Sequence, residues 1–142
     1  MASSPTTRCV RKEFARILKP GGWVVLIWND HRLELDTTPF LRGYEELLQR
    51  YGTDYEQVRQ QNVSSEIAGF FAPGSFKLKV LENSQSLDLE LKGRVFSASY
   101  TPEPGHPNFE PMLRELEAIF DAHQETGRIA IEYDTKVSYG HI

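Results

Sequence analysis

Residues 13–29 read Glu-Phe-Ala-Arg-Ile-Leu-Lys-Pro-Gly-Gly-Trp-Val-Val-Leu-Ile-Trp-Asn, and this stretch decides the fold that we expect. Before it and within it, apolar side chains recur at helical spacing, which predicts a helix that ends at Pro20-Gly21-Gly22: Val10, Phe14, Ile17 and Leu18. Residues 23–28 are apolar on both faces of an extended chain and rich in β-branched and aromatic residues, which predicts a buried central strand. A helix, a tight turn and a buried strand form half of an α/β unit.

The rest of the chain alternates between helical and extended patterns. We expect a helix over 38–51, two shorter helices after Asp54 and Ser65, and a final helix from Phe109 that closes near Gly127. Alternating apolar residues predict strands over 76–81 and 129–139. A second alternation over 85–91 gives way to a helical pattern, and the sequence leaves the position of this switch within 85–95 open.

Length and composition point to one ordinary globular domain. The chain has 142 residues, of which 39% are hydrophobic and 25% charged, and such a chain buries roughly two thirds of its unfolded surface. Cys9 is the single cysteine, which excludes a disulfide-stapled secreted scaffold. We expect a flexible leader over 1–7 and one domain over 8–142.

The charge distribution and the lack of targeting signals suggest a cytoplasmic protein. Residues 1–22 carry a local charge of +4 and the remainder −8. With a net charge of −4, this pattern argues against a nucleic-acid partner. The apolar run over 23–28 is far shorter than the ~20 residues of a membrane helix, and no signal peptide opens the chain.

The run Glu-x-x-Arg-x-Leu-Lys-Pro-Gly-Gly over 13–22, followed by an apolar strand, resembles class I S-adenosylmethionine-dependent methyltransferases, in particular the type 11 group. In that family the run joins a helix to strand five. Lys92-Gly93-Arg94, residues 97–100 and the Pro-rich loop over 101–107 are consistent with this resemblance, which extends from about residue 11 to the end. It implies a partial Rossmann-like α/β sheet of the strand five, seven and six equivalents, with the last strand of the chain in the middle and a helical cover.

The same resemblance shows what the sequence lacks. Family members hold S-adenosylmethionine with a glycine-rich loop after strand one and an acidic residue after strand two. No Gly-x-Gly-x-Gly run occurs in these 142 residues, and Gly21-Gly22 precedes a strand instead of following one. We therefore expect the C-terminal half of a methyltransferase, with no cofactor bound by this chain and no activity by itself. The methyl acceptor stays undefined.

The resemblance places a substrate pocket at the carboxyl end of the 23–28 strand, where open α/β sheets bind ligands. Six residues are expected to line it, from this strand end, the helical cover and the Pro-rich loop: Trp28, Asn29, His31, Tyr44, Tyr100 and His106. His31 is either a general base or a histidine of a surface turn, and the sequence favours the second interpretation. We assign no catalytic or cofactor-binding residue. We also assign no metal-binding residue, because the four histidines have no ligand-like spacing.

The apolar strand also predicts a partner. If the last strand lies between the other two, residues 23–28 leave one edge unpaired, and an apolar edge favours pairing with another chain. We expect a homodimer through Trp23–Trp28 or its flanking helix. Three functions stay open: a methyltransferase-family portion that is inactive alone, a small-molecule-binding or scaffold module, and one subunit of a split methyltransferase whose partner supplies the glycine-rich half.

Overall fold

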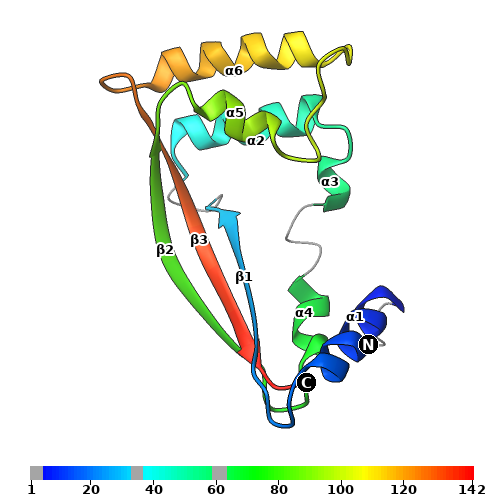
Figure 1. The fold of residues 1–142 in the computed structure, drawn as a ribbon. Coiled ribbons are helices and arrows are strands. Elements are labelled where there is room, and N and C mark those ends of the chain that lie inside the picture. The colour runs from blue at the N-terminus through cyan, green and yellow to red at the C-terminus, as the bar shows by residue number, and fades with distance from the viewer. Residues whose placement is uncertain (1–4, 33–36, 59–63) are drawn as a thin grey trace. The chain divides into compact units, whose positions relative to one another are not determined.

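A computed structural model of the chain describes residues 5–32, 37–58 and 64–142 (Figure 1). The helices are α1 (Pro5–Ile17), α2 (Pro39–Tyr51), α3 (Tyr55–Val58), α4 (Ser64–Phe70), α5 (Leu91–Phe96) and α6 (Phe109–His123). The strands are β1 (Val24–His31), β2 (Lys77–Leu87) and β3 (Ile129–Gly140). The chain forms two compact units. The first comprises Met1–Asp30, Gln60–Leu81 and Asp134–Ile142, and the second His31–Arg59 and Glu82–Tyr133.

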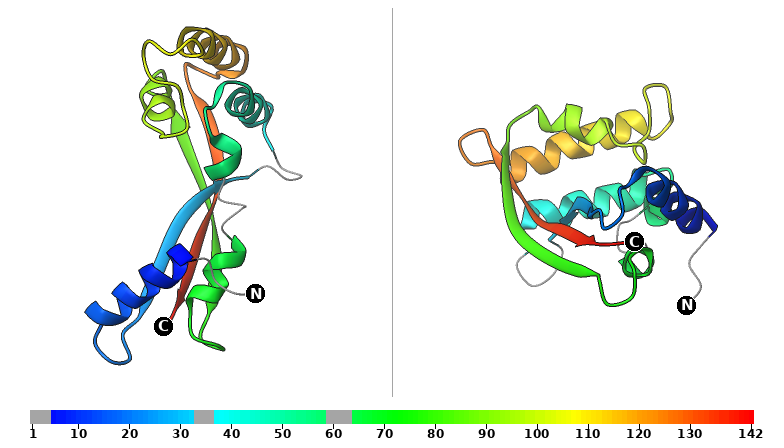
Figure 2. Two further views of the ribbon diagram at one scale, coloured as in Figure 1. Left: turned by 90° about the vertical axis from the view of Figure 1, so that its right-hand side faces the viewer. Right: turned by 60° about the horizontal axis from the view of Figure 1, so that its bottom comes forward.

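The second unit contains the larger hydrophobic core. Its buried side chains come from one face each of α2, α5 and α6 and from the start of β3, and they include Leu41, Leu48, Val95, Leu116 and Ile131. The three helices lie together in the views of Figure 2. The helix that this apolar stripe predicts is confirmed. It ends at His123, where Gln124 is already extended, and Gly127 (φ +80°) lies in the turn into β3.

The first unit has a small core. Val24, Phe70 and Phe71 are its buried hydrophobic residues, and Phe14 of α1 packs edge-on against Phe70 with ring centroids 5.5 Å apart. Trp23 instead packs against the His141 ring, with ring centroids 4.1 Å apart and the planes tilted by 42°, and the His141 Nδ1 lies 3.0 Å from the Gly22 carbonyl oxygen. These contacts join the turn before β1 to the residues that follow β3.

The sheet has three strands in the order β1-β3-β2. The expected placement of the last strand between the other two is confirmed. Strand β3 runs antiparallel to both neighbours. Toward β1, the Arg32 amide donates to the Glu132 carbonyl and Thr135 donates to Asn29. Toward β2, Ser84 donates to Glu132 and Arg128 donates to Ser86, so on both sides the partners follow one another in opposite directions. The structure is therefore an α/β protein with a small antiparallel open sheet, and the finer Rossmann-like assignment stays a prediction.

Two expectations about local structure need correction, and the structure defines one position that the sequence leaves open. Residues 23–28 are not a strand buried on both faces: β1 is an edge strand, and Trp23, Val25 and Ile27 are 55%, 52% and 64% exposed. Helix α1 begins at Pro5, within the segment predicted as a flexible leader, whose residues 1–4 lie outside the described part. The switch from strand to helix falls between Leu87 and Leu91, because pairing with β3 extends β2 through the polar residues 82–86.

Candidate functional site

Helix α2 places a carboxylate inside the second unit. Thr38 caps the helix by accepting a hydrogen bond from the Leu41 amide at 3.2 Å, and Pro39 fits its first turn. The apolar stripe then buries Leu41 and Leu48, and Glu45 lies between them on the same face, only 5% exposed. An ionised carboxylate at such a position needs partners within the protein, since its loss of hydration is costly.

Glu45 has these partners. The Tyr55 hydroxyl donates to Oε1 at 2.6 Å and to Oε2 at 2.7 Å. His31 Nδ1 lies 3.4 Å from Oε2. Tyr55 begins α3 and His31 ends β1, so three separate elements converge on one carboxylate. We call His31, Tyr44, Glu45, Tyr55 and Tyr100 the Glu45 cluster.

His31 is held between aromatic rings. Its imidazole lies 5.3 Å from the ring centroids of both Tyr44 and Tyr133, and its side chain is 15% exposed. A carboxylate beside Nδ1 favours a proton on that nitrogen, which leaves Nε2 as the acceptor in the neutral ring. No hydrogen-bond partner of Nε2 lies among the described residues. The prediction of a histidine in a surface turn is therefore wrong: the residue is part of β1 and points into a packed environment.

The tyrosines around this site stay protonated at neutral pH. Burial raises the pKa of Tyr44, and the neighbouring Tyr100 and Tyr133 add to this effect. The pKa of Tyr100 is raised by burial and by the Glu45 carboxylate. Burial also raises the pKa of Tyr133, while the Arg94 guanidinium, 5.2 Å from its ring centroid, acts in the opposite direction. The cluster thus combines neutral phenol groups with one carboxylate and one imidazole, a set suited to binding and orienting a polar group.

The structure brings together three of the six predicted site residues. His31 and Tyr44 are in ring contact, and Tyr100 joins them through Tyr55, with ring centroids 5.0 Å apart. His106 lies exposed in the Pro-rich loop, where its Nδ1 accepts a hydrogen bond from the Asn108 amide at 3.1 Å.

Trp28 and Asn29 belong to the first unit. Asn29 Oδ1 accepts a hydrogen bond from Thr135 at 2.6 Å, and Trp28 Nε1 is buried with no hydrogen-bond partner in the described part of the chain. Their role as substrate-binding residues stays a prediction.

The sequence analysis does not predict two central residues of the site, Glu45 and Tyr55. Glu45 carries a signal that could have found it, since it follows Leu41 by four residues and precedes Leu48 by three, so that an acidic residue occupies the apolar face of a predicted helix. Tyr55 carries no such signal. Its importance depends on a hydrogen bond to a residue ten positions earlier, which the helical pattern of 54–58 does not predict.

The sequence places no glycine-rich loop between a strand and the helix that follows it. The loop that holds S-adenosylmethionine follows a strand and precedes a helix, but neither strand-to-helix connection, residues 32–38 and 88–90, contains a glycine. Gly21 (φ +74°) lies in a helix-to-strand turn. In the same described ranges, no group of three or more His, Cys, Asp or Glu side chains is arranged to hold a metal ion. No helix there is long and apolar enough to span a bilayer.

The fold and the site thus define an α/β protein with a buried carboxylate–histidine–tyrosine cluster. Comparison with known proteins adds no family: no protein-family model matches the chain, and no curated protein is significantly similar to it.

Proposed function

We propose that this chain is the acceptor-binding portion of a class I S-adenosylmethionine-dependent methyltransferase and that the Glu45 cluster binds the methyl acceptor, a small molecule. The observation that carries the proposal is the Pro20-Gly21-Gly22 turn into β1 together with the strand order β1-β3-β2. The resemblance implies the same order for strands five, seven and six, with the middle strand antiparallel. Support also comes from the cluster, which lies next to the end of β1.

In this proposal the cofactor is held by residues outside these 142. We infer this because the strand-to-helix connections lack the glycines that let a backbone approach the cofactor. The remaining residues come from the same polypeptide or from a partner chain, as in a split enzyme. The 142-residue chain alone then transfers no methyl group.

The chain's own residues supply binding and proton handling. The acceptor's hydroxyl or amine donates a hydrogen bond to His31 Nε2, and the imidazole takes up its proton as the acceptor reacts. Glu45 orients the ring through Nδ1 and stabilises its positive charge, while Tyr55 keeps the carboxylate in place. The rings of Tyr44 and Tyr100 exclude water from the acceptor.

Calorimetric titration of the chain with S-adenosylmethionine tests whether residues outside these 142 are needed to bind the cofactor. We expect no binding heat from the 142-residue chain. Addition of a chain that carries the glycine-rich half is expected to restore binding. A micromolar dissociation constant for the 142-residue chain alone would refute the proposal.

A second candidate function is a scaffold that homodimerises through β1. Its support is the distribution of exposed apolar side chains: among the described residues, the large ones that are exposed lie in the first unit, except Leu89. Three of them, Trp23, Val25 and Ile27, alternate along the edge strand, and no lysine or proline interrupts residues 23–28.

Ile27→Lys is the test of this candidate. Ile27 is 64% exposed, so the substitution leaves the core intact but places a charge on the proposed interface. Sedimentation velocity is expected to show a dimer for the unmodified chain and a monomer for Ile27→Lys. Leu89→Lys, at a residue 58% exposed in the second unit, serves as control and is expected to stay dimeric. A monomer at all concentrations of the unmodified chain would exclude the scaffold.

A further inference from the structure

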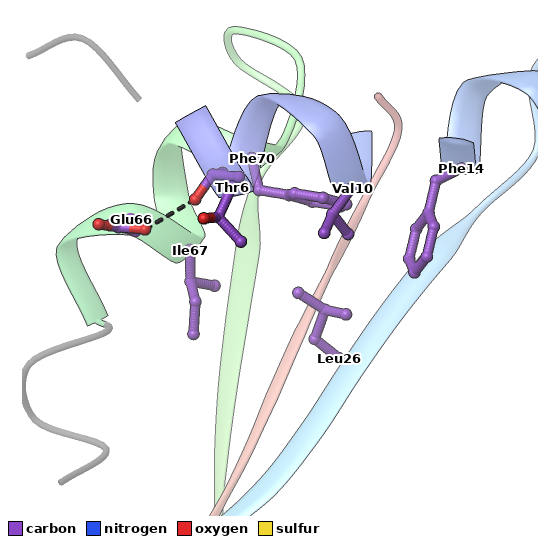
Figure 3. Close-up of a pocket in the computed structure, with 8 residues that line it drawn as sticks. Thr6, Val10, Phe14, Leu26, Glu66, Ile67 and Phe70 are labelled. Carbon is purple, nitrogen blue, oxygen red and sulfur yellow. Dashed lines mark hydrogen bonds between the residues drawn. The ribbon is translucent and has the colours of Figure 1, made fainter. Parts of the chain in front are cut away.

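The first unit contains a pocket that the proposed function does not use. It lies among α1, α4 and β1 and has a volume of about 270 Å³. Eight residues line it: Thr6, Thr7, Val10, Phe14, Leu26, Glu66, Ile67 and Phe70. Figure 3 shows Val10 of α1 and Leu26 of β1 pointing toward one another across this space, with Phe70 of α4 beside Val10. We call it the α1–α4 pocket.

The walls of the pocket are apolar and aromatic. A dry apolar cavity of about 150 Å³ is enough to hold benzene. The α1–α4 pocket is larger, so it has room for one aromatic ring with a short chain of two or three atoms. Val10 is 41% exposed, which leaves a route from solvent along α1.

One end of the pocket is polar. Thr7 Oγ1 donates to Glu66 Oε2 at 2.7 Å, and the Thr6 side chain lies at the same end (Figure 3). The Glu66 carboxylate offers acceptor oxygens and no donor at this end of the pocket. A ligand that reaches this end therefore profits from a hydrogen-bond donor and is penalised if it carries a negative charge.

We propose that the α1–α4 pocket binds a small amphiphile with a compact apolar body, the size of one aromatic ring, and a hydroxyl or amine head that donates a hydrogen bond to Glu66. Among the described residues that line the pocket, no lysine or arginine is present to bind an acidic head. This site is independent of the Glu45 cluster, and neither assignment depends on the other.

Four probes with the same ring and chain test the head group: phenethyl alcohol, phenethylamine, ethylbenzene and phenylacetate. Amide shifts in two-dimensional NMR spectra of the whole chain give the dissociation constants and the location of each probe. We expect the alcohol and the amine to bind at α1 and α4. Ethylbenzene is expected to bind about threefold to tenfold more weakly, the worth of one hydrogen bond, and phenylacetate more weakly still.

Variants distinguish binding in the apolar part of the pocket from hydrogen bonding to Glu66. Val10→Trp fills the pocket and is expected to abolish the shifts of all four probes. Ile17→Trp, on the same helix at a residue 61% exposed and outside the lining, is expected to leave them unchanged. Glu66→Gln keeps an acceptor oxygen, so it weakens the amine and preserves the alcohol. The same spectra verify that each variant is folded.

Four outcomes would overturn the proposal. They are equal affinity of all four probes, preference for phenylacetate, shifts outside α1, α4 and β1, and full binding by Val10→Trp. Binding of the alcohol without the amine, or of the amine without the alcohol, supports the pocket and narrows the head group to one of the two donors.

Discussion

Replacing Tyr55 with phenylalanine tests whether the second unit holds Glu45 as a buried carboxylate. The Tyr55 hydroxyl donates to Oε1 and Oε2 at 2.6 and 2.7 Å, and Glu45 is 5% exposed. A hydrogen bond to a charged group contributes about 1.5–3 kcal/mol, and water has little access to replace it here. We expect Tyr55→Phe to lower the free energy of unfolding of this unit by about 2 kcal/mol.

Tyr100→Phe is the matched control. Its ring lies 5.0 Å from that of Tyr55 in the same unit, but its hydroxyl has no hydrogen-bond partner among the described residues. Loss of this hydroxyl is expected to change the free energy of unfolding by less than about 0.5 kcal/mol.

Amide hydrogen exchange of α2 and α6 in increasing urea is the suitable assay, because the chain has two units and one global transition cannot be assumed. Trp23 and Trp28 both lie in the first unit, so tryptophan fluorescence follows that unit separately. With a urea dependence of about 2 kcal/mol per M, the expected loss moves the midpoint of the α2 transition by about 1 M. Equal midpoints for Tyr55→Phe and Tyr100→Phe would refute the assignment of a charged, tyrosine-held Glu45.

Two more predictions concern the second unit. Burial raises the pKa of Tyr44, Tyr100 and Tyr133, so their contribution to stability is fully present below the unfolded pKa of about 10 and is lost as the pH rises further. Absorbance titration should therefore show phenolate forming at higher pH in the native chain than in urea, and identical curves would contradict the burial of these hydroxyls. Gly52→Ala is expected to destabilise the unit by about 1–3 kcal/mol, because a Cβ there meets the Leu48 carbonyl oxygen and lies 2.9 Å from the Tyr55 Cβ. Gly93→Ala lies within α5, where no atom is within 4 Å of the new Cβ, and is expected to stabilise the unit by up to about 1 kcal/mol. Thermal melts of the two variants check this order of stability. The reverse order would show that the structure relieves the crowding at Gly52.

Most elements follow from local sequence patterns. The apolar stripes of α2 and α6 repeat at helical spacing, and the glycine and proline residues around them mark their ends, so both helices are predicted close to their observed bounds. Strand β3 alternates along its whole length, which predicts it equally well. In each of these cases the pattern that predicts the element lies within the element's own residues.

Strand β2 shows where local pattern fails. Residues 82–86, Glu-Asn-Ser-Gln-Ser, have the composition of a loop. They are extended because β3 supplies backbone partners and because Ser86 and Asp88 bind the Arg128 guanidinium. Pairing with a distant strand therefore decided their conformation.

The candidate site was partly predictable. The positions of His31 at a strand end and of Tyr44 in the helical cover predict both residues, and the structure brings their rings into contact. Glu45 and Tyr55 depend on the convergence of β1, α2 and α3, which no single segment encodes. The meeting of these side chains is a property of the packed unit.

The stretch over 13–29 by itself determined a helix, a sharp glycine-proline turn and a strand, because steric rules for Pro20 and Gly21 act within a few residues. It also determined the resemblance that the proposed function depends on. Only the tertiary structure decided that Trp23, Val25 and Ile27 are exposed, since burial depends on which segments pack against a strand. The same reason applies to Glu45, whose carboxylate lies inside the protein with Tyr55 and His31 beside it.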